Sequence, residues 1–77
     1  MTPEAFCAAI REELAQVNSD DGWARGARGL CEMYAGADAD RFDGILSEMA
    51  RGSAGSSAMV QGAQWLLARW RDARDIR

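Results

Sequence analysis

The sequence contains no histidine and no lysine, so every basic side chain is an arginine. Histidine is the commonest general base and metal ligand, and lysine forms Schiff bases and holds phosphates. Arginine stays protonated near neutral pH and is a poor proton-transfer group. Carboxylates, serines, two cysteines and one tyrosine remain as candidate catalytic groups, and no pair among them is set apart from ordinary surface residues. We therefore expect a protein that is not an enzyme.

Metal-binding patterns are also missing. Only Cys7 and Cys31 offer thiols, whereas a structural zinc site usually takes four Cys or His ligands. The acidic run 38–44 does not fit a calcium-binding EF-hand loop, because its fifth position would be Phe42 and its twelfth Met49. We therefore expect no metal and no cofactor.

Long apolar runs are absent as well. No stretch approaches the roughly 20 apolar residues that a membrane span needs, and residues 1–4 lack the basic and apolar regions of a signal peptide. We expect a cytoplasmic protein with no membrane contact. In that compartment Cys7 and Cys31 are interpreted as buried, reduced thiols, with a disulfide or a redox switch as the alternatives.

Helical periodicity is present in four segments of the 77 residues, separated by short breaks, and this length allows one domain. Thr2 and Pro3 are typical of a helix start, Asp38 or Asp40 of a second start, and Gly52 of a helix end. The apolar positions at helical spacing are Phe6, Cys7, Ile10, Leu14, Val17; Trp23, Ala27, Leu30, Tyr34; Phe42, Ile45, Leu46, Met49; and Met59, Val60, Ala63, Leu66, Leu67, Trp70. We predict an all-α fold, a compact four-helix bundle or orthogonal helical array, in a single small helical domain over residues 1–77. The fourth helix is expected to start at Ser56 or Ser57.

A stripe of small residues accompanies the apolar face of the second predicted helix, over residues 22–35. Gly22, Gly26 and Gly29 recur at helical spacing and lead to Met33. Each glycine inside a helix costs about 0.5–1 kcal/mol relative to alanine. The stripe predicts that another helix backbone, or a large ring such as that of Trp65 or Trp70, lies close to it. A broken or mobile segment is the alternative.

Charge is divided unevenly along the chain. Residues 1–48 carry ten acids and four arginines, and residues 49–77 carry five arginines and two acids. This balance argues against a general nucleic-acid binder and favours a protein partner with a basic patch, or end-to-end self-association. The candidate partner-binding acids are Glu12, Asp38, Asp40, Asp43 and Glu48. The alternative is that these acids only form a solvated surface that keeps the protein soluble.

A second candidate surface lies on the fourth predicted helix, nearly opposite its core face. There Trp65 is aligned with Arg69, Asp72 and Ile76, a composition typical of interface hot spots. We therefore predict that Trp65 and Arg69 bind a partner. The alternative is that the helix is covered on two sides, or that Trp65 stacks on Arg69 within the chain.

In size, acidity and lack of catalytic residues the chain resembles the small acidic inhibitors of phages and mobile elements, including anti-CRISPR proteins. The resemblance implies a non-enzymatic module that covers a basic nucleic-acid-binding surface of a larger protein or ribonucleoprotein complex, without direct contact to nucleic acid. One alternative is a structural subunit that homodimerises through residues 22–33 or Trp65, or completes a larger assembly. The other is a redox switch built on Cys7 and Cys31.

Overall fold

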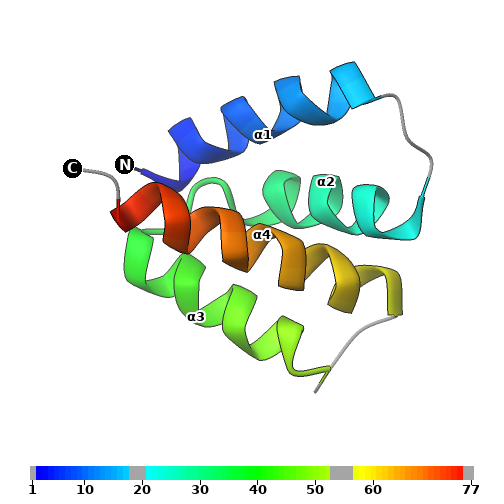
Figure 1. Cartoon of the computed structure of the whole chain (residues 1–77). Coiled ribbons are helices and arrows are strands. Elements are labelled where there is room, and N and C mark those ends of the chain that lie inside the picture. The colour runs from blue at the N-terminus through cyan, green and yellow to red at the C-terminus, as the bar shows by residue number, and fades with distance from the viewer. Residues whose placement is uncertain (1, 18–20, 53–56, 76–77) are drawn as a thin grey trace.

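The protein is all-α, as predicted, and its computed structural model describes residues 2–17, 21–52 and 57–75. Helix α1 spans Pro3–Val17, α2 Gly22–Tyr34, α3 Ala39–Ala50 and α4 Ser57–Asp75. The described residues contain no strand. Figure 1 shows the four helices packed side by side, with the start of α1 and the end of α4 at the same end of the molecule.

The helix ends follow the local signals in the sequence. The Ala5 amide donates to the Thr2 hydroxyl at 3.2 Å, and the Arg41 amide donates to the Asp38 carboxylate at 2.8 Å. Each bond satisfies a donor that the first turn of a helix leaves unpaired. After α3 the backbone turns at Gly52, whose φ of 77° favours glycine. Asp38, and not Asp40, is therefore the cap of α3.

Helix α4 is the central element of the fold. It packs along α2 on one side and along α3 on the other, while α1 lies mainly on α2. In Figure 1, α2 and α4 run in the same direction, and α1 and α3 run the opposite way. A helix with neighbours on two sides has to bury more than one stripe of its surface. Side chains on two faces of α4 are therefore covered by neighbouring helices.

Aromatic rings form the centre of the core. Phe6 of α1, Phe42 of α3 and Trp70 of α4 meet edge to face, with ring centroids 5.0–6.0 Å apart. This geometry matches the preferred packing of aromatic pairs. The other buried apolar residues surround the cluster: Cys7, Ile10, Leu14, Ala24, Ala27, Leu30, Cys31, Leu46, Ala63 and Leu66. The predicted core face of each helix is thus confirmed in part. Five of its members are only partly buried against the cluster, namely Trp23, Tyr34, Met49, Met59 and Leu67. Ile45 and Val60 are half-buried outside the cluster, and the side chain of Val17 lies outside the described residues.

Two glycines allow the backbones of α2 and α4 to touch. A Cβ atom added to Gly26 would overlap the Ala58 carbonyl group and stand 3.1 Å from the Cα of Met59. A Cβ added to Gly62 would stand 2.5 Å from the Ala27 nitrogen. The glycine stripe of α2 therefore correctly predicts a close helix backbone at Gly26. The alternative of a broken segment is wrong, because α2 is one continuous helix. Gly29 has nothing within 4 Å of such an atom, so the close contact with α4 does not extend to it.

We predict that Gly26→Ala and Gly62→Ala each lower the free energy of unfolding by about 1–3 kcal/mol, because the new methyl group forces α2 and α4 apart. Gly29→Ala and Gly44→Ala are matched controls inside helices with open space around them. These controls should stabilise the protein by up to about 1 kcal/mol. Urea unfolding followed by circular dichroism measures all four. Equal effects at the four positions would contradict the close approach.

Candidate functional site

The acids predicted to bind a partner on α3 lie beside arginines of the same chain. The Asp43 carboxylate is 3.4 Å from the Arg74 guanidinium and 3.8 Å from that of Arg71, and Asp40 is 4.0 Å from Arg74. At the other end of α3, Glu48 pairs with Arg51 at 3.5 Å. The expected free acidic face is therefore partly neutralised within the molecule. Asp38 is exposed and serves as the helix cap described above.

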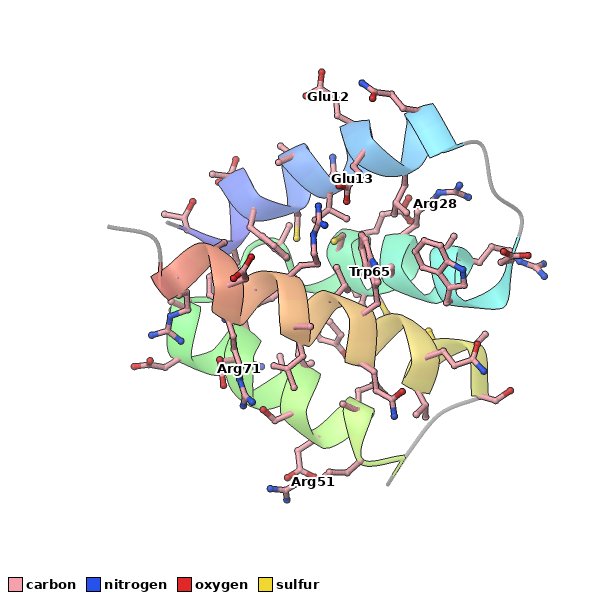
Figure 2. The ribbon with its side chains drawn as sticks, in the orientation of Figure 1. Glu12, Glu13, Arg28, Arg51, Trp65 and Arg71 are labelled. Atoms are coloured by element: carbon pink, nitrogen blue, oxygen red, sulfur yellow. The ribbon has the colours of Figure 1, made fainter. Side chains whose placement is uncertain are left out.

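The two glutamates at the middle of α1 point in different directions. Glu12 is exposed and extends away from the molecule, whereas Glu13 is turned toward α4 (Figure 2). There Glu13 forms an ion pair with Arg69. Glu12, a candidate partner-binding acid, is thus accessible to a partner. Glu13 lies three residues from the buried Ile10, at the edge of the apolar face, and is half-buried there.

Trp65 is half-buried, which corrects the prediction that it is an exposed anchor. Its ring packs on the Trp23 ring of α2, with centroids 5.1 Å apart. The Arg69 guanidinium lies 5.3 Å from the same ring, within cation–π distance. Both alternatives considered for Trp65 are thus realised, because α4 is covered on two sides and Arg69 stacks on the ring. Ile76, the last member of the predicted patch, lies outside the described residues.

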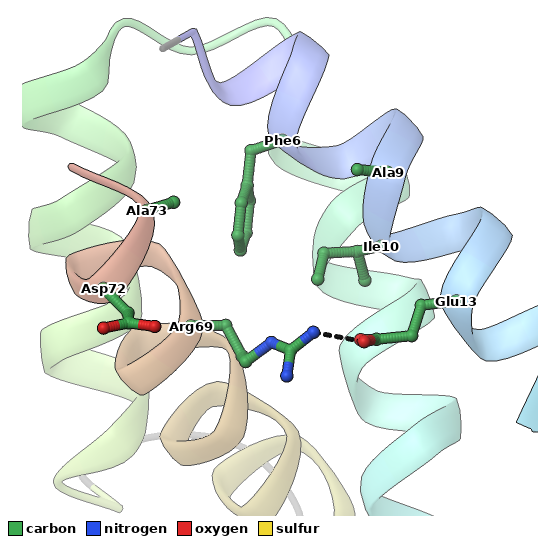
Figure 3. Close-up of a pocket in the computed structure, with 7 residues that line it drawn as sticks. All are labelled: Phe6, Ala9, Ile10, Glu13, Arg69, Asp72 and Ala73. Carbon is green, nitrogen blue, oxygen red and sulfur yellow. Dashed lines mark hydrogen bonds and ion pairs between the residues drawn. The ribbon is translucent and has the colours of Figure 1, made fainter. Parts of the chain in front are cut away.

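A groove of about 400 Å³ lies between α1 and α4, next to the Glu13–Arg69 pair (Figure 3). Its apolar lining comes from Phe6, Ala9, Ile10 and Ala73, and its charged lining from Glu13, Arg69 and Asp72. Two carboxylates face one guanidinium, so the groove carries a net negative charge. The Oε2 atom of Glu13 is buried, and no described residue donates a hydrogen bond to it. An unsatisfied carboxylate oxygen favours the approach of a further donor.

A second, smaller hollow surrounds the end of α2. Its volume is about 290 Å³, and Met33, Tyr34, Ala37 and Arg41 contribute to its lining. Met33 is 57% exposed, which is unusual for a large apolar side chain in this molecule. The hollow contains one cation and no carboxylate, so it lacks the negative charge of the groove between α1 and α4.

The two cysteines are free thiols buried in the core between α1 and α2. Their side chains share a hydrogen bond, which together with burial raises the pKa of the Cys31 thiol above its ordinary value. The same hydrogen bond lowers the pKa of the Cys7 thiol. A thiol reacts as its thiolate, so the raised pKa makes Cys31 a poor nucleophile, whereas Cys7 is protected by its burial alone. The interpretation of Cys7 and Cys31 as buried thiols agrees with this geometry.

Within the described residues, no group of three or more Cys, Asp or Glu side chains is arranged to hold a metal ion. None of the described helices combines the length and the apolar character that crossing a membrane requires. No protein-family model, curated protein or solved structure matches the chain.

We predict that Trp65→Ala lowers the free energy of unfolding by about 1–3 kcal/mol, because the Trp23 ring and the core beside it lose their contact. Met33→Ala removes a large apolar side chain that is mostly exposed, and it should change stability by less than about 0.5 kcal/mol. Thermal unfolding of the two variants measures both changes in stability. If Trp65→Ala were as mild as Met33→Ala, Trp65 would be available as an anchor for a partner.

We predict that a thiol reagent such as DTNB labels Cys7 and Cys31 at least about 100-fold more slowly in native buffer than in denaturant, because labelling requires the core to open. Absorbance of the released thiolate gives both rates. Rapid labelling of either thiol in the native protein would contradict this account. So would formation of a Cys7–Cys31 disulfide in mild oxidant without loss of the fold, a result that would favour the redox switch.

Proposed function

We propose that the protein is a non-enzymatic binding module that docks on a basic surface of a larger protein or ribonucleoprotein complex. In this role it would act as the small acidic inhibitors of phages and mobile elements do, anti-CRISPR proteins among them, by covering a surface that otherwise binds nucleic acid. It would not bind nucleic acid itself, and it would act in the cytoplasm.

One observation supports the proposal most directly: the described arginines of residues 49–77 form ion pairs with acids of the same chain. Of the arginines in residues 49–77, the four that the structure describes each lie within ion-pair distance of a carboxylate: Arg51, Arg69, Arg71 and Arg74. Within the described part of this segment, every arginine is therefore paired with a carboxylate, which disfavours its use in binding phosphates. With a net charge of −3, the molecule presents a negative field to its surroundings.

Exposed carboxylates remain on several helices and support docking on a cationic surface. Glu12 of α1, Glu32 of α2 and Asp40 of α3 are all exposed, and the Asp40 side chain is 97% accessible. Rim charges of this kind steer association and set its salt dependence more than they set affinity. They support a partner rich in arginine and lysine.

The alternative of a homo-oligomeric structural subunit loses much of its predicted interface. Gly22 and Gly26 pack on Ala58 of α4, and Trp65 packs on Trp23, so both surfaces predicted for a second copy are used inside the molecule. Met33 remains exposed at the end of the stripe. Self-association through Met33 would be resistant to salt, because an apolar contact does not depend on screening.

We predict that the tagged protein captures a basic, nucleic-acid-binding complex from a lysate of its own source, and that nucleic acid competes with it for that complex. The triple variant Glu12→Gln, Glu32→Gln, Asp40→Asn should bind at least about tenfold more weakly at low salt. A matched triple variant that neutralises the exposed arginines, Arg11→Gln, Arg25→Gln, Arg41→Gln, should bind as well as the native protein or better.

Mass spectrometry identifies the captured chains, and electrophoretic mobility of a labelled nucleic acid measures the competition. Capture that withstands high salt and the loss of all three carboxylates would contradict the proposal. Recovery of the protein alone, as a salt-resistant oligomer, would instead favour the structural subunit.

A further inference from the structure

The groove between α1 and α4 has the shape to take a long side chain. Phe6, Ala9 and Ile10 of α1 face Ala73 of α4 across it, and charged groups lie along its edge (Figure 3). Few residues of α1 and α4 contact each other directly, so the groove stays open between them. Long basic side chains bury their methylene stems on apolar surface while their charged heads stay at a polar edge. The lining suits such a side chain.

The groove carries a net negative charge, so it favours a positively charged occupant. Arg69 engages the Oε1 atom of Glu13 and leaves the Oε2 atom of the same carboxylate without a donor among the described residues. Asp72 adds a second, exposed carboxylate to the lining. A cation entering beside them would restore neutrality, whereas an anion or an uncharged polar group would leave the excess negative charge in place.

The buried Oε2 atom can reach a donor in the groove without a change of fold. The Glu13 side chain as a whole is 37% exposed, and the terminal torsion of glutamate has a broad energy well. Because Glu13 itself lines the groove, rotation about this torsion can present its carboxylate to a donor there. A carboxylate can accept hydrogen bonds at both oxygens, so a second guanidinium can bind while Arg69 keeps its own contact.

We propose that this groove binds an arginine side chain from the partner's basic surface. The inference rests on the proposed function and adds the position at which the partner is held. The stem of the arginine lies on Phe6, Ile10 and Ala73, and its guanidinium donates to Glu13 with Asp72 beside it. The planar fork of arginine matches a carboxylate better than the single ammonium group of lysine does.

The test uses the whole protein and three capped hexapeptides as probes. They are identical except for one central position, which holds arginine, lysine or the uncharged isostere citrulline. Amide chemical shifts in a two-dimensional NMR titration report where each probe binds. The arginine peptide should shift the amides of Ala9, Glu13, Asp72 and Ala73. The lysine peptide should bind more weakly than the arginine peptide, and the citrulline peptide should bind at least about tenfold more weakly.

Adjacent glutamates provide a matched pair of variants. Glu13→Gln and Glu12→Gln change the net charge equally, but only Glu13 faces the groove (Figure 2). Glu13→Gln should weaken arginine-peptide binding about tenfold, and Glu12→Gln should change it less than about twofold. Because Glu13 also pairs with Arg69, Asp72→Asn provides a second variant in case Glu13→Gln fails to fold. It should weaken binding about threefold or more.

Each outcome has a distinct meaning. Shifts confined to the groove that require arginine, Glu13 and Asp72 support the inference. Shifts elsewhere, binding of the citrulline peptide equal to that of arginine, or equal effects of Glu12→Gln and Glu13→Gln overturn it. If the groove fails while capture of the basic complex still depends on Glu12, Glu32 and Asp40, only this inference is wrong. If the groove binds arginine but no basic complex is captured, the proposed function is wrong.

Discussion

The arrangement of the helices depends on direct contact between the backbones of α2 and α4. Gly26 meets Ala58 and Met59, and Gly62 meets Ala27, so no side chain separates the two helices at their crossing. Such proximity increases dispersion contacts and permits weak Cα–H···O interactions. It also offsets the cost of placing glycine inside two helices. With α4 held against α2, the other face of α4 remains for α3, and α1 is left to lie mainly on α2.

This placement of α1 explains why a groove with a charged edge lies between α1 and α4. The two helices are joined at one end by the rings of Phe6 and Trp70 and further along by the Glu13–Arg69 pair. Between these contacts a groove stays open, because α1 follows α2 more closely than it follows α4. The same geometry brings the acids of α3 beside Arg71 and Arg74, which neutralises much of the basic tail. Fold and charge distribution therefore have a common origin in the position of α4.

Local features of the structure are readily predicted from the sequence, and long-range ones are not. The caps at Thr2 and Asp38 and the stop at Gly52 depend on residues within a single turn, so their signals are present in the sequence. Only the choice between Asp38 and Asp40 as the cap of α3 required the structure. The glycine stripe of α2 also predicts a close helix, but nothing in it identifies Ala58 and Gly62 as the partners. Those depend on how α4 is placed.

The site was harder to predict, because a helical wheel assumes that only one face of a helix is covered. Trp65 lies opposite the core face of α4 on such a wheel, yet α2 covers that side as well and Trp23 receives the ring. Glu13 lies next to the apolar stripe of α1, and its pairing with Arg69 requires knowledge of the α1–α4 separation. Asp43 was predicted to face a partner, and it faces Arg71 and Arg74 instead, because α3 packs antiparallel to α4.

The most direct test of this account is a nuclear Overhauser measurement on the isotope-labelled protein. The contact of α2 with α4 predicts strong cross-peaks between the Hα protons of Gly26 and Met59, and between the Hα protons of Gly62 and the amide of Ala27. Protons this close produce intense signals at short mixing times. If both cross-peaks were absent while the helices themselves were intact, α4 would not lie against α2, and the groove between α1 and α4 would have no structural basis.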